Sequence, residues 1–369
     1  MPNQPNILLL TAQTGGGHLS LADALQDLLE ERYAVTIVDM LPAFIHYHYR
    51  FVGRYALWMW AVEFHFSNRP REALAYQRLL APLITSRLKR ALDEVRPAMV
   101  ITTHSLLSHS VKQVLREHAP EIPLGMLFSD PYSVHETWFS ELNAEASFAP
   151  TRESRELALA AGFDPSRLHM VGWPVRKQFY QADGAKRGEV LCGIELEPDR
   201  FTVFLQGGGD GATNYWRLAE RLLAVNKDIQ IILSAGTNAG LVRRLRGIKR
   251  LHVLPFLKEI APFMAASDVI MGKAGPNVLF EAVVLDKPFV ATTYFPGQEK
   301  GNLEFIERHG LGGVALKFEQ QCEAIRALSK MGKRSDGLTA KVREYREWNR
   351  AANEMVPSVV DELLRGLAR

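Results

Sequence analysis

Short runs of apolar residues alternate along the chain with longer segments that carry apolar side chains at helical spacing. An apolar run at residues 7–10 is followed by a helical pattern over 19–32 and by a second apolar run at 34–39. Short uninterrupted apolar runs are typical of strands that are buried on both faces of a parallel sheet. The pattern therefore predicts an α/β fold in which helices cover a parallel sheet.

The same alternation starts again after residue 180. The predicted strands are residues 7–10, 34–39, 99–102, 124–128 and 145–149 in the first half, and 201–205, 229–233, 251–254, 269–271 and 288–291 in the second. Gly172-Trp173-Pro174 and the polar stretch 181–188 supply turn and linker chemistry between the halves. The last helical pattern, 338–369, is interrupted by Pro357 and is compatible with packing on the second half or crossing back to the first.

We therefore predict two Rossmann-like, doubly wound domains, residues 1–175 and 176–369. Ligands of such domains bind at the carboxyl ends of the strands. If the two domains face each other, these ends line a shared cleft. The length of 369 residues and the apolar fraction of 47% suit two cores of ordinary size.

The cysteine content and the lengths of the apolar runs indicate in which cellular compartment the protein is expected. Cys192 and Cys322 are the only cysteines, which gives neither a disulfide framework nor a metal site and fits a reducing cytoplasm. The first residues lack a signal-peptide pattern, and no uncharged apolar run approaches the roughly 20 residues that cross a bilayer. We expect a cytoplasmic protein that is soluble or lies on a membrane surface.

Residues 41–80 interrupt the α/β pattern and read as an insertion rich in aromatic and basic side chains. Residues 41–90 hold eight Lys/Arg and only two Asp/Glu. Aromatic and basic side chains together suit the headgroup layer of a membrane, which favours an anionic membrane surface as partner. The alternative is a helical insertion whose aromatics pack on the domain. No nucleic-acid-binding module is recognisable, so nucleic acid is not an expected partner. The aromatic residues are Phe44, Tyr47, Tyr49, Phe51, Tyr55, Trp58, Trp60, Phe64 and Phe66.

A glycine-rich loop, Thr14-Gly15-Gly16-Gly17-His18, follows the first predicted strand and opens the first helix. Glycines let the backbone approach a ligand closely, and the free N–H groups at a helix start favour an anion. The loop is not a dinucleotide fingerprint, because Ser20 stands where the third glycine would be. His18 could take a proton from a hydroxyl, or could make only a structural hydrogen bond.

A second glycine-rich loop follows the first strand of the second domain. It includes Gly207, Gly208, Gly209 and Asp210, and its N–H groups could form a nest for phosphate.

Two further segments follow later strands of the second domain. Lys273 and the start of a helix suit phosphate, and a carboxylate farther along that helix could accept hydrogen bonds from ribose hydroxyls. Amide and acid side chains in the last loop could bind the hydroxyls of a sugar, or belong to an ordinary polar loop. The residues are Lys273, Gly275, Pro276, Asn277 and Glu281 in the first segment and Gln298, Glu299 and Asn302 in the second.

These motifs, taken in order, resemble the monogalactosyldiacylglycerol synthases and the bacterial diacylglycerol glucosyltransferases. More distantly they resemble the peptidoglycan N-acetylglucosaminyl transferase that makes a lipid-linked disaccharide; all share the GT-B architecture. The resemblance covers nearly the whole chain. It rests on the glycine loop ending at His18, Ser129-Asp130 with Trp138, Gly172–Arg176, the loop 207–211, Lys273–Pro276 with Glu281, and Gly297–Glu299 with Asn302.

The resemblance implies an inverting transfer of a hexose from a UDP-sugar to a lipid hydroxyl. The donor is a substrate, no cofactor is implied, and the absence of an Asp-x-Asp motif agrees with the family's lack of an obligatory metal. By the same resemblance, residues 207–211 and 273–277 hold the diphosphate, Glu281 the ribose, and Gln298, Glu299 and Asn302 the hexose. His18 is then the base or orients the acceptor. Asp130, which follows the predicted strand 124–128, is its rival for the base or could orient His18.

Three alternatives stay open from the sequence. The fold could serve a soluble or peptidoglycan-type acceptor, a non-catalytic nucleotide-sugar binder, or a UDP-sugar epimerase.

Overall fold

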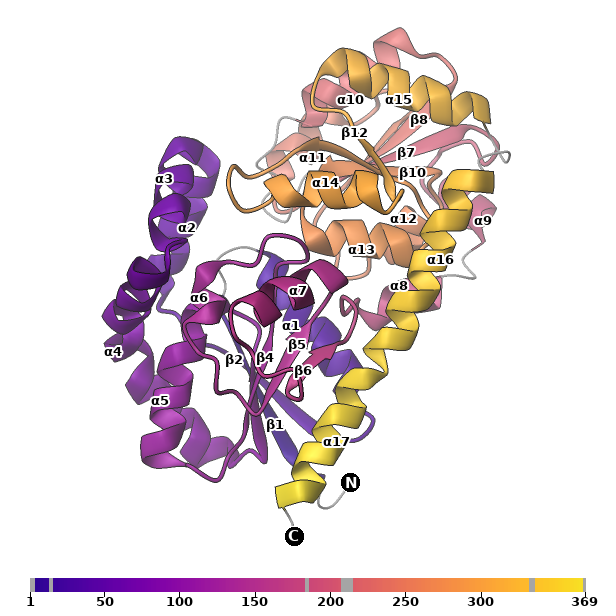
Figure 1. Cartoon of the computed structure of the whole chain (residues 1–369). Helices are drawn as coiled ribbons and strands as arrows, with labels where there is room; N and C mark the ends of the chain where they lie inside the picture. Colours follow the sequence, from indigo (N-terminus) through magenta and orange to yellow (C-terminus); the bar gives the residue numbers. More distant parts are fainter. Residues whose placement is uncertain (1–3, 13–15, 183–185, 207–214, 332–335, 368–369) are drawn as a thin grey trace. The chain divides into compact units, whose positions relative to one another are not determined.

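The computed structural model describes residues 4–12, 16–182, 186–206, 215–331 and 336–367 (Figure 1). Thr14, Gly15 and the second glycine loop, including Gly207, Gly208, Gly209 and Asp210, lie outside the described residues.

Two six-stranded sheets form the framework, and every strand pairing within them is parallel. The first has the strand order β2-β1-β3-β4-β5-β6, and the second β12-β11-β10-β7-β8-β9. In each sheet the chain first proceeds to one side and then returns to the other side of its starting strand. The order therefore reverses between β1 and β3 and between β7 and β10, and such reversals are where doubly wound sheets bind ligands. The predicted α/β class is confirmed.

Contacts between residues divide the chain into two compact units. Unit 1 comprises residues 1–176, 296–298 and 348–369, and unit 2 comprises residues 177–295 and 299–347. Ten strands lie within a residue or two of the predicted positions. Two more, β6 and β12, are three-residue strands at sheet edges and were not predicted.

The first sheet and its helices follow the chain in order. Their bounds are β1 Asn6–Thr11, α1 Gly16–Leu29, β2 Ala34–Asp39, α2 Ala43–Tyr55, α3 Leu57–Ser67, α4 Pro70–Val95, β3 Met99–Thr102, η1 Ser105–Leu107, α5 Ser108–His118, β4 Leu124–Leu127, α6 Glu136–Phe139, β5 Ala146–Ala149, α7 Arg152–Ala160 and β6 Leu168–Met170.

The second sheet and the C-terminal helices complete the chain. Their bounds are α8 Lys177–Gln181, α9 Arg187–Gly193, β7 Phe201–Gln206, α10 Tyr215–Val225, β8 Ile229–Ser234, α11 Ala239–Leu245, β9 Leu251–Leu254, α12 Ala261–Ala265, β10 Val269–Lys273, α13 Pro276–Val284, β11 Phe289–Thr293, α14 Lys300–Arg308, β12 Gly312–Val314, α15 Phe318–Met331, α16 Asp336–Asn353 and α17 Met355–Leu367.

The central strands are buried on both faces, as their continuous apolar runs predict. Residues 7–10 of β1 and residues 229–232 of β8 are almost completely inaccessible to solvent. Helices cover both faces of such sheets, because each β–α–β crossover places its helix against the sheet. Each unit thus has a core of its own that holds the carboxyl ends of its strands in place.

The end of α16 is fixed to the turn that follows β6. The Asn349 side chain accepts a hydrogen bond from the Trp173 N–H (2.7 Å) and donates one to the Trp173 carbonyl (2.9 Å). The neighbouring Gly172 has φ +70°, and a Cβ there would lie 2.8 Å from the Asn349 carbonyl oxygen. Glycine is therefore required at this turn by both conformation and space.

The last helix, α17, packs on α1 within unit 1. Asp361 of α17 accepts hydrogen bonds from Arg32 (2.6 Å) and from the Tyr33 hydroxyl.

Candidate functional site

Three titratable side chains lie in the segments that follow the strands near the reversal of the first sheet. His18 lies in the first turn of α1, which follows β1. His104 comes two residues after β3, and Asp130 comes three residues after β4. Because β1, β3 and β4 are neighbours and parallel, their carboxyl ends meet at one edge of the sheet. The segments that follow these strands therefore present His18, His104 and Asp130 at the same edge.

His18 is held by the backbone of the strand-end segment beside it. Its Nδ1 lies 3.2 Å from the carbonyl oxygen of Thr103. Because a carbonyl only accepts, Nδ1 carries the proton and the lone pair is on Nε2. Burial lowers the pKa of His18 to about 4, although the bond to Thr103 acts in the opposite direction. The imidazole is therefore neutral near neutral pH, which is the state that a general base requires.

His104 packs directly against His18 and was not among the predicted site residues. The two ring centroids are 4.2 Å apart. Nδ1 of His104 accepts a hydrogen bond from the Leu106 N–H (3.3 Å) at the start of η1, which places the His104 proton on Nε2. Burial lowers the pKa of His104 well below its usual value, and the nearby His18 and His135 lower it further. The only sequence signal for His104 was its place directly after a predicted strand.

Asp130 is a buried carboxyl group near the same strand ends. Its Oδ2 accepts a hydrogen bond from the indole N–H of Trp138 (3.2 Å). Burial raises the pKa of Asp130 to about 7, while hydrogen bonds from the His135 backbone and from Trp138 lower it. Among the described residues, Asp130 makes neither a hydrogen bond nor an ion pair with His18. The two candidates for the base thus have separate environments and opposite pKa shifts.

The aromatic insertion reaches this region through His135. The His135 ring meets the ring of Phe64 on α3 edge-on, with centroids 4.9 Å apart, and its Nε2 lies 3.3 Å from the Ser67 hydroxyl. Burial lowers the pKa of His135 to about 4. A neutral histidine therefore joins α3 to the backbone that hydrogen bonds with Asp130.

The insertion itself forms α2, α3 and the start of α4 (Figure 1). Large apolar side chains of α2 and α3 are exposed. Spacings of three and four residues place the exposed side chains of each helix on one side. We call this set the exposed aromatic face. Its members and exposed fractions are Phe44 61%, Tyr47 69% and Phe51 59% on α2, and Trp58 71%, Val62 62% and Phe66 60% on α3.

The reversal point of the second sheet lies between β7 and β10. Gln206 ends β7, and its buried Oε1 has no hydrogen-bond partner among the described residues. Gly272 of β10 lies beside it, because a Cβ at Gly272 would be 3.2 Å from that of Gln206. A buried acceptor without a partner at a ligand-binding edge is a candidate ligand contact that the sequence did not single out.

Lys273 ends β10 and is engaged on two sides. Its ammonium group forms an ion pair with Glu299 and lies 4.3 Å from the centre of the Phe295 ring. The other Glu299 oxygen accepts the Phe295 N–H (2.8 Å). A Cβ at Gly275 would lie 3.3 Å from the Lys273 Nζ, so glycine lets the chain pass the lysine closely. Lys273, Gly275 and Glu299 thus form one contact group.

Other predicted donor residues lie on the elements that follow. Pro276 and Asn277 open α13, and Glu281 is buried on the same helix. Asn302 is buried on α14 and donates a hydrogen bond to the Ala274 carbonyl (2.8 Å). In unit 2, the structure thus brings Lys273, Glu299 and Asn302 together around residues 273–275. Gln298 lies in the loop before α14 and is assigned to unit 1.

Two negative findings concern the described residues alone. They contain no group of three or more His, Cys, Asp or Glu side chains that could hold a metal ion. None of their helices is long and apolar enough to cross a membrane.

Solved structures with similar architecture include glycosyltransferases and UDP-N-acetylglucosamine 2-epimerases. The calicheamicin glycosyltransferase CalG4 superposes with a TM-score of 0.67 over the whole of both chains at 14% identity. MurG of Acinetobacter baumannii gives a TM-score of 0.62 over 97% of this chain and 99% of its own, also at 14% identity. UDP-N-acetylglucosamine 2-epimerases are among the neighbours, with a TM-score of 0.61 for that of Rickettsia bellii. At these identities the likeness establishes the GT-B fold.

The family models divide the chain in the same way as the sheets. Residues 18–175 match the monogalactosyldiacylglycerol (MGDG) synthase family, and residues 202–346 match the glycosyltransferase family 28 C-terminal domain. The chain is therefore a GT-B glycosyltransferase that uses a UDP-sugar. Among relatives, monogalactosyldiacylglycerol synthase 2, chloroplastic, of Arabidopsis thaliana is 27% identical over 83% of this chain and 70% of its own. Synthase 3 of the same plant is also 27% identical over 83% of this chain. Over most of its length the chain is thus similar to monogalactosyldiacylglycerol synthases.

Proposed function

We propose that this enzyme transfers a hexose from a UDP-sugar to the free hydroxyl of diacylglycerol, with inversion at the anomeric carbon. The names of the relatives favour galactose as the hexose. The single observation that carries the mechanism is the His18 imidazole, neutral and held through Nδ1 by the Thr103 carbonyl at the sheet reversal point.

In the proposed reaction the acceptor hydroxyl lies against the Nε2 of His18. The hydroxyl oxygen bonds to the anomeric carbon while the bond from that carbon to the β-phosphate oxygen breaks. The hydroxyl proton passes to Nε2, and UDP leaves with the bonding electrons. His104 is a positioning residue in this scheme, because its ring covers one side of the base. Asp130 stays the rival for the base.

The donor is proposed to lie at the reversal point of the second sheet. Lys273, the start of α13 at Asn277 and the loop with Gly207, Gly208, Gly209 and Asp210 would bind the diphosphate and stabilise its growing charge electrostatically. Glu281 would bind the ribose, and Gln298, Glu299 and Asn302 the hexose. Gly16 and Gly17, at the start of α1, would offer backbone N–H groups on the acceptor side.

We further propose that the exposed aromatic face meets an anionic membrane from which the lipid acceptor enters. Large amphipathic aromatics that stay outside the core suit the headgroup layer, and exposed arginines on α4 suit anionic lipids. A soluble acceptor would leave the six exposed side chains of this face without a role.

The substitution His18→Ala tests the assignment of the base. Loss of a proton-transfer group costs on the order of 10²–10⁴-fold in rate, so we expect kcat to fall by that factor while UDP binding is unchanged. Near-normal turnover of the folded variant, with donor binding intact, would mean that His18 is not the base. The matched variant Asp130→Asn keeps the volume of that side chain while removing its titratable group, and is expected to retain more activity than His18→Ala.

A further inference from the structure

One glutamine of the aromatic insertion is completely buried. Gln77 lies on α4, which packs against η1, α5 and α6, and none of its surface is exposed to solvent. A buried amide group costs free energy unless its donors and its acceptor are paired. The hydrogen-bond partners of Gln77 therefore show which parts of the chain this side chain holds.

The amide group of Gln77 joins α4 to two other segments. Its Nε2 donates to the carbonyls of Ser105 and Thr137, both at 2.6 Å, and its Oε1 accepts the backbone N–H of His109 (3.2 Å). A carbonyl only accepts and a backbone N–H only donates, so these partners determine the orientation of the amide. One side chain of α4 thus fixes η1 with the start of α5 on one side and α6 on the other.

The Ser108 hydroxyl belongs to the same network. It lies 3.1 Å from the Ser105 carbonyl and 3.2 Å from the Thr137 carbonyl, and it is completely buried as well. A hydroxyl has a single proton, so Ser108 alone cannot satisfy both carbonyls. The Gln77 amide is therefore needed to hold the two segments together.

The first of these segments places a histidine of the acceptor site. Ser105 directly follows His104, whose ring packs on His18 with 4.2 Å between the centroids. The backbone N–H of Leu106 donates to Nδ1 of His104 (3.3 Å), so the orientation of this ring depends on the position of η1. By holding the Ser105 carbonyl, Gln77 restrains the segment that keeps His104 against His18.

The second segment leads to the other candidate for the base. Thr137 is followed by Trp138, whose indole N–H donates to Asp130 (3.2 Å). The Thr137 hydroxyl lies 2.7 Å from Nδ1 of His135, at the start of the same helix. By holding the Thr137 carbonyl, Gln77 restrains the groups that surround Asp130.

We propose that Gln77 is a positioning residue of the transfer reaction. Through η1 it keeps His104 against His18. Through α6 it keeps the Trp138 indole on Asp130. A fully paired buried network specifies one arrangement of its segments, and a displacement of about 1 Å at reacting groups can cost about 100-fold in rate. This inference rests on the proposed function, because it assumes proton transfer at this edge of the sheet, but it holds for either candidate base.

The first test is the activity of Gln77→Met. This variant keeps the length of the side chain and removes its donors and its acceptor. We expect kcat to fall by about 10- to 100-fold, because the segments on either side of the base are free to shift. We expect UDP binding to be unchanged, because the residues proposed to bind the diphosphate belong to unit 2 and Gln77 belongs to unit 1.

The second test does not depend on activity and follows the titration of the histidine rings by NMR. Burial lowers the pKa of both His18 and His104, that of His18 to about 4. If η1 shifts in Gln77→Met, water reaches the two rings and their titration midpoints rise towards the ordinary value of about 6.5. Gln77→Asn keeps an amide on a shorter side chain. It should change the titrations in the same direction, and it replaces Gln77→Met if that variant does not fold.

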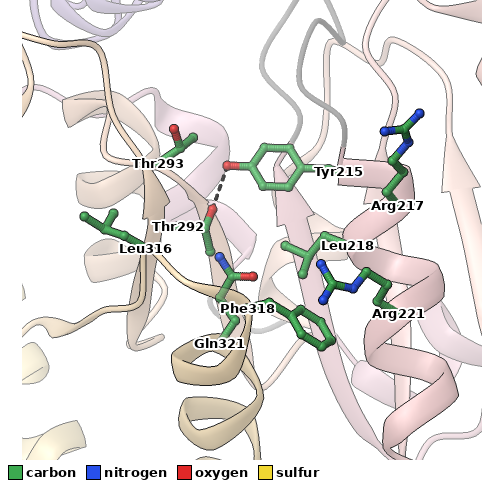
Figure 2. Close-up of a pocket in the computed structure, with 9 residues that line it drawn as sticks. All are labelled: Tyr215, Arg217, Leu218, Arg221, Thr292, Thr293, Leu316, Phe318 and Gln321. Atoms are coloured by element: carbon green, nitrogen blue, oxygen red, sulfur yellow. Dashed lines mark hydrogen bonds between the residues drawn. The ribbon is translucent and has the colours of Figure 1, made fainter.

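Two control variants remove buried hydrogen bonds from unit 2. Gln230 is 1% exposed and bonds through its amide to the Glu197 backbone and to the Thr202 hydroxyl, so Gln230→Met is the matched change. Tyr215→Phe removes the hydroxyl contact with Thr292 (2.7 Å) at the pocket shown in Figure 2. Both changes lie outside unit 1, so neither should move the histidine titrations. Circular dichroism establishes that each variant is folded.

The possible results separate this proposal from the proposed function. Histidine titrations of the folded Gln77 variants that equal those of wild type, or that move as much in the two controls, would overturn the positioning role. Raised midpoints together with a wild-type kcat would show that Gln77 places these rings but that they take no part in the transfer. That result would contradict the role proposed for His18.

Discussion

His18 and Asp130 are the two candidates for the general base, and their opposite pKa shifts predict different pH dependences. Burial lowers the pKa of His18 to about 4 and raises that of Asp130 to about 7. If His18 is the base, kcat/KM should stay level as the pH falls from neutral and decline only towards pH about 4. If ionised Asp130 is required, the decline should begin near pH about 7. The pH dependence of kcat/KM, measured on wild type and on Asp130→Asn, decides between them.

The free energy of unfolding also changes in this pH range, so it must be measured together with kcat/KM. The unfolded chain protonates a histidine near its ordinary pKa of about 6.5, whereas folded His18 and His135 protonate only near 4. At these two histidines the unfolded state binds more protons between these values, so they lower the free energy of unfolding as the pH falls. Asp130, whose pKa is raised on folding, contributes in the opposite direction. Circular dichroism at each pH shows whether a loss of rate reflects unfolding. A decline near pH 7 in the folded Asp130→Asn variant would contradict both assignments.

The sequence predicted His18 but not His104, and the difference has a physical reason. A glycine-rich loop between a strand and a helix is a local pattern, and it identifies the histidine that ends it. The role of His104 depends on the neighbouring strand order, which brings residues from the ends of β1 and β3 together. No local pattern contains that information. For the same reason, no local pattern predicts the ion pair of Lys273 with Glu299, because these residues belong to two separate sequence motifs.

At the scale of the element, α2 and α3 carry the proposed membrane contact. Trp58 and Phe66 are 71% and 60% exposed, so replacing both by Ser removes apolar surface without opening a cavity. We expect weaker binding to anionic vesicles and a raised KM for the lipid acceptor, with little change in thermal stability. The control is Phe256→Ser, because Phe256 is 58% exposed and belongs to unit 2. Equal vesicle binding by the two variants in a sedimentation assay would exclude this face as the contact.

The join between α16 and the turn after β6 gives a prediction about stability. Asn349→Ala removes two hydrogen bonds to Trp173 and leaves a buried N–H and a buried carbonyl without them. The expected cost is about 3 kcal/mol, from the lost bonds and the unsatisfied groups. Calorimetry should show a lower midpoint of thermal unfolding. Ser358→Ala, an exposed site on α17 with only a local bond to Glu354, should stay within about 0.5 kcal/mol of wild type.

The strands and helices differ in how well the sequence predicts them. Buried strands such as β1 and β8 have apolar runs that stand out from the helices around them. The edge strands β6 and β12 have three residues each and no continuous apolar pattern, so the sequence did not reveal them. The sequence pattern predicted the C-terminal helices, but an amphipathic pattern does not indicate against which element a helix packs. Their contacts with Trp173 and with α1 come from the structure.

At the scale of the whole molecule, the chain has two parallel sheets, each with one reversal of strand order, and two family models match successive parts of it. Together they identify the chain as a glycosyltransferase. Its substrates are proposals that rest on named relatives and on the chemistry of the sites. The donor hexose and the acceptor are therefore the points that a direct assay must decide.

The most direct measurement is UDP release by the purified protein with UDP-galactose, UDP-glucose, UDP-N-acetylglucosamine or UDP-glucuronate, each with and without diacylglycerol vesicles. We predict release with UDP-galactose that requires the diacylglycerol and is lost in His18→Ala. Release with one of the other donors, again dependent on the vesicles, would change the sugar and keep the reaction. No diacylglycerol-dependent release with any donor, by a protein that binds UDP, would contradict the proposed transfer to this lipid.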